Sequence, residues 1–245
     1  MSEQFVYGVH AVAALLTNQH RRIETLYVNQ ERIDSRIQDL LSLANQQGIF
    51  IEYLTAQAMN QQFGNFVHQG VVAKADKLPE FNERHIGPLL KSSKSPCLIL
   101  ILDGVTDPHN LGACLRTADG AGVDFVIIPK DKSANITPVV SKVACGAAEF
   151  MPLVRVTNLA RVLETLKQEG VWIYGAAGEA TTSIYALDHQ RPVALVMGAE
   201  GKGLRRLTRE HCDSLFSLPM LGSVSSLNVS VAAGVCLYEI VRQRL

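Results

Sequence analysis

The alternation of strand and helix patterns from Cys97 onward most constrains the fold of this chain. Two of its strand segments, LILIL at residues 98–102 and ALVMG at residues 194–198, carry no polar side chain. A strand without a polar face must be covered on both sides, as in a parallel sheet between two layers of helices. The pattern therefore predicts a doubly wound α/β domain over residues 97–245.

We expect six strands in this domain, at residues 98–104, 125–129, 152–156, 171–176, 194–198 and 215–219. Helices are expected to begin near Leu111, Pro138, Leu159 and Leu204, and a last apolar helix spans residues 229–244. Thr137 before Pro138 predicts an N-cap, as does Asn158 before Leu159.

Residues 1–75 predict a smaller α/β domain. Helical patterns occupy residues 8–17, 33–47 and 55–63, where Thr55 is the expected N-cap, and strand patterns occupy 23–28, 49–54 and 70–75. This segment has five basic and six acidic residues, so a broad electrostatic grip on nucleic acid is not expected of it. Prolines and the run KSSKS interrupt periodicity between residues 76 and 96, which we interpret as a linker, with a helix over residues 84–92 as the alternative for part of it.

Composition excludes several classes of protein. A hydrophobic content of 47% with 19% charged residues is typical of a globular chain rather than a disordered one. The net charge is zero, which lowers the expectation of nucleic-acid binding but permits a local basic patch. The five cysteines form no CxxC pair, so no zinc or redox motif is indicated. Neither a signal peptide nor a long apolar run is evident, and we expect a cytoplasmic protein without membrane segments.

Three loops carry more polar chemistry than packing requires, and in such sheets ligands bind beyond the carboxyl ends of the strands. In the first, Asn110 stands at the expected helix start and Arg116 lies nearly two turns on. The plainer alternatives are an N-cap and a surface charge. Asp103, Asp107 and His109 lie nearby but lack a metal-ligand spacing, so no metal is expected.

The second loop, GAEGKG at residues 198–203, lets backbone approach a ligand closely because of its glycines. Its G-x-x-G-x-G order differs from the dinucleotide fingerprint. Glu200 can orient a cationic side chain or accept a proton there. Three arginines, at 205, 206 and 209, follow this loop. They can form either a solvated helix face or a patch that contacts phosphate.

The third loop, residues 218–228, joins a short strand to the last helix and is rich in glycine and serine. It lacks the G-x-S-x-G pattern of a serine nucleophile. Ser226 or Asn228 can cap the helix, a role that is compatible with a second role in a site.

Taken together, NLGACLRTAD (110–119), LVMGAEGKG (195–203) and LPMLGSVSSLNVSV (218–231) resemble, in order and spacing, the three motifs of the SpoU/TrmH branch of SPOUT RNA methyltransferases. YGVHAV (7–12) and HQGVVA (68–73) resemble the L30e-like substrate-binding domain of ribosomal members. The resemblance implies transfer of a methyl group from S-adenosylmethionine to a guanosine 2′-hydroxyl of 23S ribosomal RNA. It also implies a deep trefoil knot and a homodimer formed through the C-terminal domain.

The family's site residues carry over to matching positions. The cofactor set is Gly198, Leu218 and Leu227, with Met197 and Met220 close by. The catalytic or RNA-positioning set is Asn110, Arg116, Glu200, Ser226 and Asn228. A guanidinium group does not give up its proton in proteins, so we interpret Arg116 as a clamp on substrate phosphate or a polariser of the 2′-oxygen, oriented by Glu200 or Asn110. The proton acceptor and the position of the methylated nucleotide stay open.

Two other classes of function would leave different residues at these positions. A non-catalytic RNA-binding protein with the same fold would be expected to lose Asn110, Arg116 or Asn228, yet all three are present. A nucleotide-dependent oxidoreductase would carry the glycine fingerprint after its first strand, which this chain lacks.

Overall fold

The computed structural model describes residues 3–18, 21–64, 68–93 and 95–245, so Lys94 of the predicted linker lies outside the described residues. The chain divides into two compact units. The smaller comprises Met1–Pro79 and Ile136–Phe150, and the larger comprises Glu80–Asn135 and Met151–Leu245. Each unit has its own sheet, and both are α/β as the sequence predicts.

The smaller unit contains a four-stranded sheet in the order β1-β4-β2-β3. Its strands are β1 (Glu3–Tyr7), β2 (Ile23–Asn29), β3 (Phe50–Leu54) and β4 (Val71–Asp76). β4 runs antiparallel to both of its neighbours, whereas β2 and β3 are parallel. The helices are α1 (Val9–Thr17), α2 (Ser35–Gln46) and α3 (Ala56–Phe63). Three predicted helices and three predicted strands are confirmed, and β1 is an additional strand.

Caps and buried side chains explain these helices. The Ala58 amide donates to Oγ1 of Thr55 (3.2 Å), which confirms the predicted N-cap of α3. Leu15, Leu16 and Leu40 of α1 and α2 are buried in one apolar cluster, and Met59 and Phe63 of α3 are buried in a second.

The segment Ile136–Phe150 belongs to the smaller unit although the chain order places it among the strands of the larger one. It forms α6 (Pro138–Val143), whose predicted cap Thr137 accepts from the Val140 amide (3.3 Å). Within the unit, the buried side chains of Arg21 and Glu149 form an ion pair. Burial raises the pKa of Glu149 and the Arg21 charge opposes that rise.

The larger unit contains a seven-stranded sheet in the order β11-β9-β10-β6-β7-β8-β5, with every neighbouring pair parallel. The strands are β5 (Phe81–Asn82), β6 (Leu98–Asp103), β7 (Phe125–Pro129), β8 (Leu153–Val156), β9 (Trp172–Ala176), β10 (Val193–Gly198) and β11 (Ser214–Phe216). All six predicted strands are present. However, β11 ends at Phe216 rather than Pro219, so Leu218 lies in the loop.

The predicted linker contains regular structure. β5 pairs with β8 and is followed by α4 (Ile86–Ser92). Ile86 is buried in the core of the larger unit, and Leu89 and Leu90 pack against that core. A two-residue strand such as β5 is too short to show periodicity, and it forms because it pairs with a strand distant in sequence.

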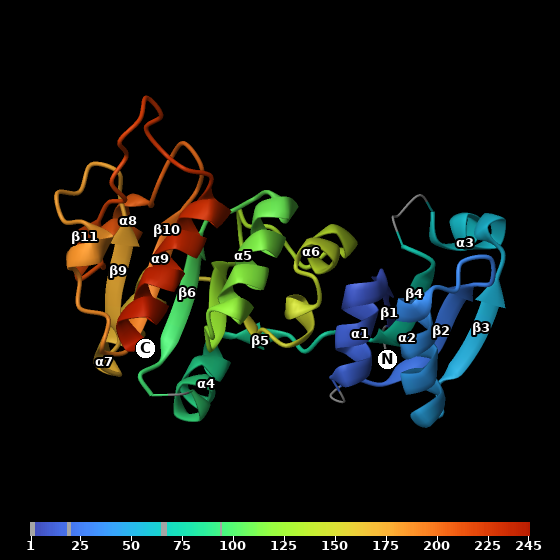
Figure 1. Cartoon of the computed structure of the whole chain (residues 1–245). Helices are drawn as coiled ribbons and strands as arrows, with labels where there is room; N and C mark the ends of the chain where they lie inside the picture. Colours follow the sequence, from blue (N-terminus) through green and yellow to red (C-terminus); the bar gives the residue numbers. More distant parts are fainter. Residues whose placement is uncertain (1–2, 19–20, 65–67, 94) are drawn as a thin grey trace. The chain divides into compact units, whose positions relative to one another are not determined.

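Helices cover the seven-stranded sheet on both sides. α5 (Pro108–Gly120) and α9 (Val229–Arg244) lie side by side, as Figure 1 shows. On the other face, Leu163 and Leu166 of α7 (Leu159–Gln168) pack in one core cluster with Ile99 of β6. α8 (Arg206–Glu210) follows β10. The predicted doubly wound arrangement is therefore confirmed. None of the described helices combines the length and apolar character needed to cross a membrane.

Strand register brings two of the polar loops to one place. β6 and β10 are adjacent and parallel, and their last paired residues are Asp103 and Gly198. The first and second loops therefore leave the sheet at the same edge. Figure 1 shows the loop between β11 and α9 at that same end of the larger unit.

The backbone at Gly198 leaves no room for a side chain. A Cβ atom there would lie 2.2 Å from the carbonyl carbon of Gly203. The intervening turn is closed by two backbone hydrogen bonds between Ala199 and Gly203, of 3.1 and 2.9 Å. Gly201 and Gly203 have φ angles of 72° and 64°, in the left-handed region that favours glycine. The turn is therefore held against the end of β10.

We expect Gly198→Ala to lower the free energy of unfolding by about 1–3 kcal/mol, because the added methyl group must displace backbone rather than a flexible side chain. Urea unfolding checks this. Gly222→Ala is the matched control, because a Cβ atom at Gly222 meets nothing within 4 Å. Equal stability of the two variants would contradict the close approach of Gly203 to Gly198.

Candidate active site

The first turn of α5 places an asparagine at the edge of the sheet. Asp107 is the N-cap, since its Oδ1 accepts from the His109 amide (3.0 Å), and Pro108 is the first helical residue. Asn110 is therefore not the cap, contrary to the plainer alternative. Its side chain is only 8% exposed and is held by partners from the two other loops.

Asn110, Glu200 and Asn228 form a closed ring of hydrogen bonds. The Asn110 amide donates to Oε1 of Glu200 (3.0 Å). The Asn228 amide donates to the same oxygen (2.7 Å) and to Oδ1 of Asn110 (2.9 Å). Each residue comes from a different loop, so the ring joins the three sequence motifs. Among the described residues, Oε2 of Glu200 makes no hydrogen bond and stays open to a ligand.

Asn228 has two roles at once. Its Oδ1 accepts from the Ser230 amide (2.9 Å), which caps α9. Its amide nitrogen makes the contacts of the ring. The capping role therefore coexists with a role in the site, and Ser226 is not the cap.

A cavity of about 720 Å³ lies beside the ring. All five residues of the predicted cofactor set line it: Met197, Gly198, Leu218, Met220 and Leu227. Among the described residues, no hydrogen bond is made by the backbone N–H groups of the loop residues that line the cavity before Asn228: Leu218, Met220, Ser225, Ser226 and Leu227. Such groups need a partner wherever water is excluded. The cavity thus combines apolar side chains with open backbone donors.

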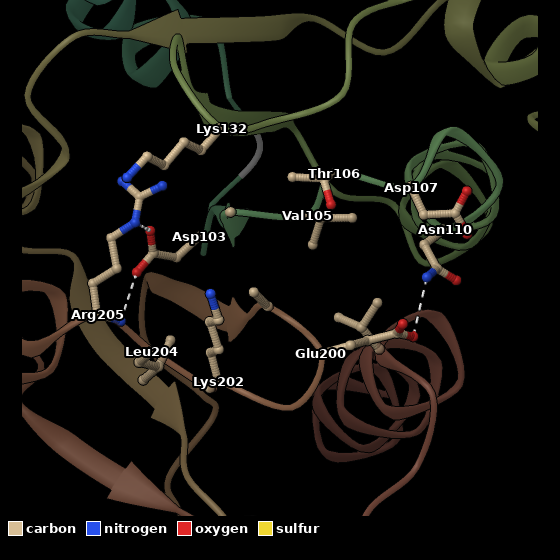
Figure 2. A pocket seen from close by; sticks show the side chains of 14 residues that line it. Asp103, Val105, Thr106, Asp107, Asn110, Lys132, Glu200, Lys202, Leu204 and Arg205 are labelled. Carbon is tan, nitrogen blue, oxygen red and sulfur yellow. Dashed lines mark hydrogen bonds and ion pairs between the residues drawn. The ribbon is translucent and has the colours of Figure 1, made fainter.

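A second cavity, of about 690 Å³, lies beside the same turn of residues 199–203 (Figure 2). Glu200 lines both cavities, and Asn110 lines the second. Three basic residues also line it: Lys132, Lys202 and Arg205. Lys202 and Arg209 also line the first cavity, so cations border both cavities, as does the ring.

Two residues of the predicted catalytic set are not brought into the ring. Arg116 is exposed on α5 and makes no hydrogen bond or ion pair with the described residues, so neither Glu200 nor Asn110 orients it as we expected. Ser226 is exposed and lines the first cavity, with no hydrogen bond within the described part of the chain.

The three arginines after the second loop do not form one patch. Arg205 lines the second cavity and Arg209 lines the first, where it pairs with Glu179. Arg206 pairs with Glu210 (2.8 Å) and lines neither cavity.

The sequence did not identify Lys132 or the role of Asp103. Lys132 follows β7 in a stretch without a recognisable motif, and only the folded chain brings it to this cavity. Asp103 is 1% exposed, accepts from the Arg205 amide (3.0 Å) and lies 3.3 Å from Nε of Arg205.

The side chains near the ring do not indicate covalent catalysis by a thiolate. Burial, with a smaller contribution from the charge of Glu200, raises the pKa of Cys114 to about 12. This thiol stays protonated at neutral pH. In the described ranges, no group of three or more His, Cys, Asp and Glu residues is placed to hold a metal ion. Asp103 is paired with Arg205, and Asp107 caps α5.

The fold and the site together define a class of protein. Its members have a parallel α/β unit with three loops at one edge of the sheet. Polar residues from these loops are hydrogen-bonded to one another beside a cavity that contains open backbone donors. Residues 97–238 match the SpoU rRNA Methylase family, and residues 5–81 match the family described as RNA 2′-O ribose methyltransferase substrate binding. The chain belongs to the SpoU rRNA methylase family.

Full-length relatives and a solved structure agree with this assignment. The chain is 56% identical over 246 residues to the 23S rRNA (guanosine-2′-O-)-methyltransferase RlmB of Pasteurella multocida, covering all of both chains. It is also 56% identical to RlmB of Haemophilus influenzae, covering 100% of this chain and 99% of the relative. In fold it is similar to the SpoU methyltransferase AviRb of Streptomyces viridochromogenes in complex with the cofactor AdoMet, with a TM-score of 0.82, 24% identity, and coverage of 99% and 90%.

Substitution of Asn228 separates its two roles. We expect Asn228→Ser to change the free energy of unfolding by only a few tenths of a kcal/mol, because serine is an equally good N-cap, whereas Asn228→Ala loses about 1 kcal/mol. Both variants remove the amide donor to Glu200, so both should lose most methyl transfer. Thermal unfolding and a methyl-transfer assay check this. Full activity of Asn228→Ser would show that the ring is not needed.

Proposed function

We propose that this protein transfers a methyl group from S-adenosylmethionine to the ribose 2′-hydroxyl of a guanosine in 23S ribosomal RNA. The observation that carries the proposal is the ring of Asn110, Glu200 and Asn228, which joins the three family motifs at a border between two cavities. The substrate follows from the relatives, which are named for it and match the chain from end to end.

The first cavity fits the cofactor. Apolar side chains of Met197, Leu218, Met220 and Leu227 suit its uncharged parts. The open backbone N–H groups of Leu218, Met220 and Leu227 suit the hydrogen-bonding edge of adenine. Gly198 keeps the turn of residues 199–203 close to β10, so that Glu200 faces both cavities. When bound, the cofactor supplies a methyl group on a sulfonium centre.

The ring orients the group that meets the substrate hydroxyl. Two amide donors hold Oε1 of Glu200, and Oε2 is left to accept a hydrogen bond from the ribose 2′-hydroxyl. A hydroxyl fixed in this way has its oxygen lone pairs directed toward the methyl group, and its proton has an acceptor as the new O–C bond forms. Asn110 and Asn228 therefore act by positioning Glu200, and no metal ion is required.

Arg116 and the smaller unit complete the proposal. Arg116, exposed and unpaired among the described residues, clamps a phosphate of the RNA. Residues 1–75, which the match to the substrate-binding family covers from residue 5 onward, select the RNA by local contacts and shape. We further propose domain boundaries at residues 75 and 97, a trefoil knot in the C-terminal domain and a cytoplasmic location.

Methylation of 23S ribosomal RNA tests the function. With S-adenosylmethionine, the full chain should form one 2′-O-methylguanosine in 23S RNA, read by mass spectrometry, and should leave transfer RNA unmodified. Arg116→Lys should lose most turnover if the bidentate guanidinium is needed. Absence of the modified guanosine would refute the function, and equal modification of transfer RNA would refute the selector role.

We also propose a homodimer through α9. Val231, Val235 and Tyr238 follow one another at helical spacing and are 52%, 37% and 53% exposed. Together they form an apolar stripe beside α5, since Tyr238 donates to the Gly120 carbonyl (3.4 Å). A surface stripe of this kind on a helix is typical of a self-complementary interface.

A charge in the stripe should separate the subunits. We expect Val235→Asp to elute as a monomer where the unaltered chain elutes as a dimer, because the interface would bury an unpaired carboxylate. Size-exclusion chromatography with light scattering measures this. Leu207→Asp, at an exposed apolar residue of α8 (51%), is the control and should stay dimeric. A dimeric Val235→Asp variant would place the interface elsewhere.

A further inference from the structure

We propose that Lys132 and Arg205, assisted by Lys202, form a subsite for a backbone phosphate of the RNA, in the second cavity and beside the ring. This inference rests on the proposed function and assigns it residues that lie outside the predicted catalytic set. It begins from the lining of the second cavity, which collects cations from two separate loops, whereas Lys202 and Arg209 of the first cavity both follow β10.

The cations converge from different parts of the chain. Lys132 comes from the loop after β7, whereas Lys202 and Arg205 come from the segment after β10. Figure 2 draws the Lys132 and Arg205 side chains at the same end of the cavity, and the Lys132 carbonyl and a terminal nitrogen of Arg205 both lie near Gly104. Both residues are exposed and carry positive charge at one cavity, which favours binding of an anion there. A phosphate group supplies that anion and accepts hydrogen bonds from both side chains.

The acidic residues of the cavity do not neutralise these cations fully. Asp103 binds the backbone amide and Nε of Arg205, which leaves the two terminal nitrogens of that guanidinium group for another partner. Asp107 accepts from a backbone amide at the start of α5, and Glu200 is held by the ring. Neither Lys132 nor Lys202 forms an ion pair with any residue in the described ranges.

Arg205 is built into the site more firmly than an ordinary surface arginine. The carboxylate of Asp103, which is 0% exposed in its side chain, lies beneath it and contacts it at both the backbone and Nε. Lys132 is also constrained, because its backbone has a φ of 58°, in the left-handed region. Strained conformations of this kind persist where the surrounding structure enforces them and occur often at ligand sites.

The cations and the ring lie along one cavity, in an order that suits a bound nucleotide. Figure 2 shows Lys132 and Arg205 at one end of the cavity, the Asn110–Glu200 pair at the other, and Lys202 between them. A nucleotide has its phosphate and its 2′-hydroxyl on the same sugar, so a phosphate held by Lys132 and Arg205 directs a ribose along the cavity toward Glu200. Phosphate contacts fix position rather than sequence. The subsite therefore sets where the ribose lies relative to Glu200.

The test compares neighbouring cations of the same charge. Lys132→Ala and Arg205→Gln are each measured against a matched control, Lys130→Ala and Arg206→Gln. The controls are exposed and line neither cavity. For each variant we measure the KM for 23S RNA, the salt dependence of RNA binding, and the Kd for S-adenosylmethionine by calorimetry. Thermal unfolding confirms that each variant is folded.

We expect each cavity variant to raise the KM for RNA roughly tenfold, as loss of a hydrogen bond to a charged group does. The slope of log K against log salt should fall in magnitude by about 0.7 per cation removed. The Kd for S-adenosylmethionine and both controls should stay near the values of the unaltered chain.

Two results would overturn the subsite. In one, the cavity variants behave as their controls do while the unaltered chain methylates 23S RNA. In the other, they weaken S-adenosylmethionine binding and leave the KM for RNA unchanged, which would assign the cations to the cofactor carboxylate. Failure of the unaltered chain to methylate 23S RNA would instead count against the proposed function, so the two failures are distinguishable.

Discussion

The parallel pairing of β6 with β10 is the constraint on which the site depends. Their register ends at Asp103 and Gly198, so the chain leaves both strands at one point on the carboxyl edge of the sheet. Two loops that are about a hundred residues apart in sequence thereby begin side by side. The hydrogen bonds of the site then depend on how these two loops pack against each other and against the start of α9.

Closure is achieved by hydrogen bonds and by glycine. The absence of a side chain at Gly198 lets the turn of residues 199–203 fold back onto β10. This places Glu200 where Asn110 and Asn228 can both donate to one of its oxygens. Because Asn228 also caps α9, the orientation of the site is coupled to the last helix. A site held in this way needs little reorganisation when ligands bind.

The cations that gather at the second cavity are not visible in the composition of the chain. The chain has 23 basic and 23 acidic residues, and its net charge of zero gives no sign of an RNA-binding protein. The charges are nevertheless sorted locally. Arg206 and Arg209 are paired with glutamates, whereas Lys132 and Lys202 have no acidic partner among the described residues. Because these lysines are unpaired, a protein of zero net charge has a local positive potential at this cavity. Such a potential can attract one phosphate group, although the protein has no broad basic face.

The sequence predicted the strands of the large sheet well because each is an apolar run bounded by turn residues, a signal that is local. It also located the caps Thr55, Thr137 and Asn158 for the same reason. It missed β5, since a two-residue strand has no periodicity and exists only by pairing with β8. It grouped residues 136–150 by chain order, whereas contacts assign them to the smaller unit.

For the site, the sequence by itself determined the three motifs and hence the identity of Asn110, Glu200 and Asn228. Their spacing along the chain could not reveal that these three form a ring or that Arg116 lies outside it. It also could not reveal that Arg205 lines a cavity whereas Arg206 does not. Those outcomes depend on strand order and on which side of the 199–203 turn each side chain falls. The tertiary structure alone decided them, because hydrogen bonds and charge pairs depend on distances in space that no local pattern of residues records.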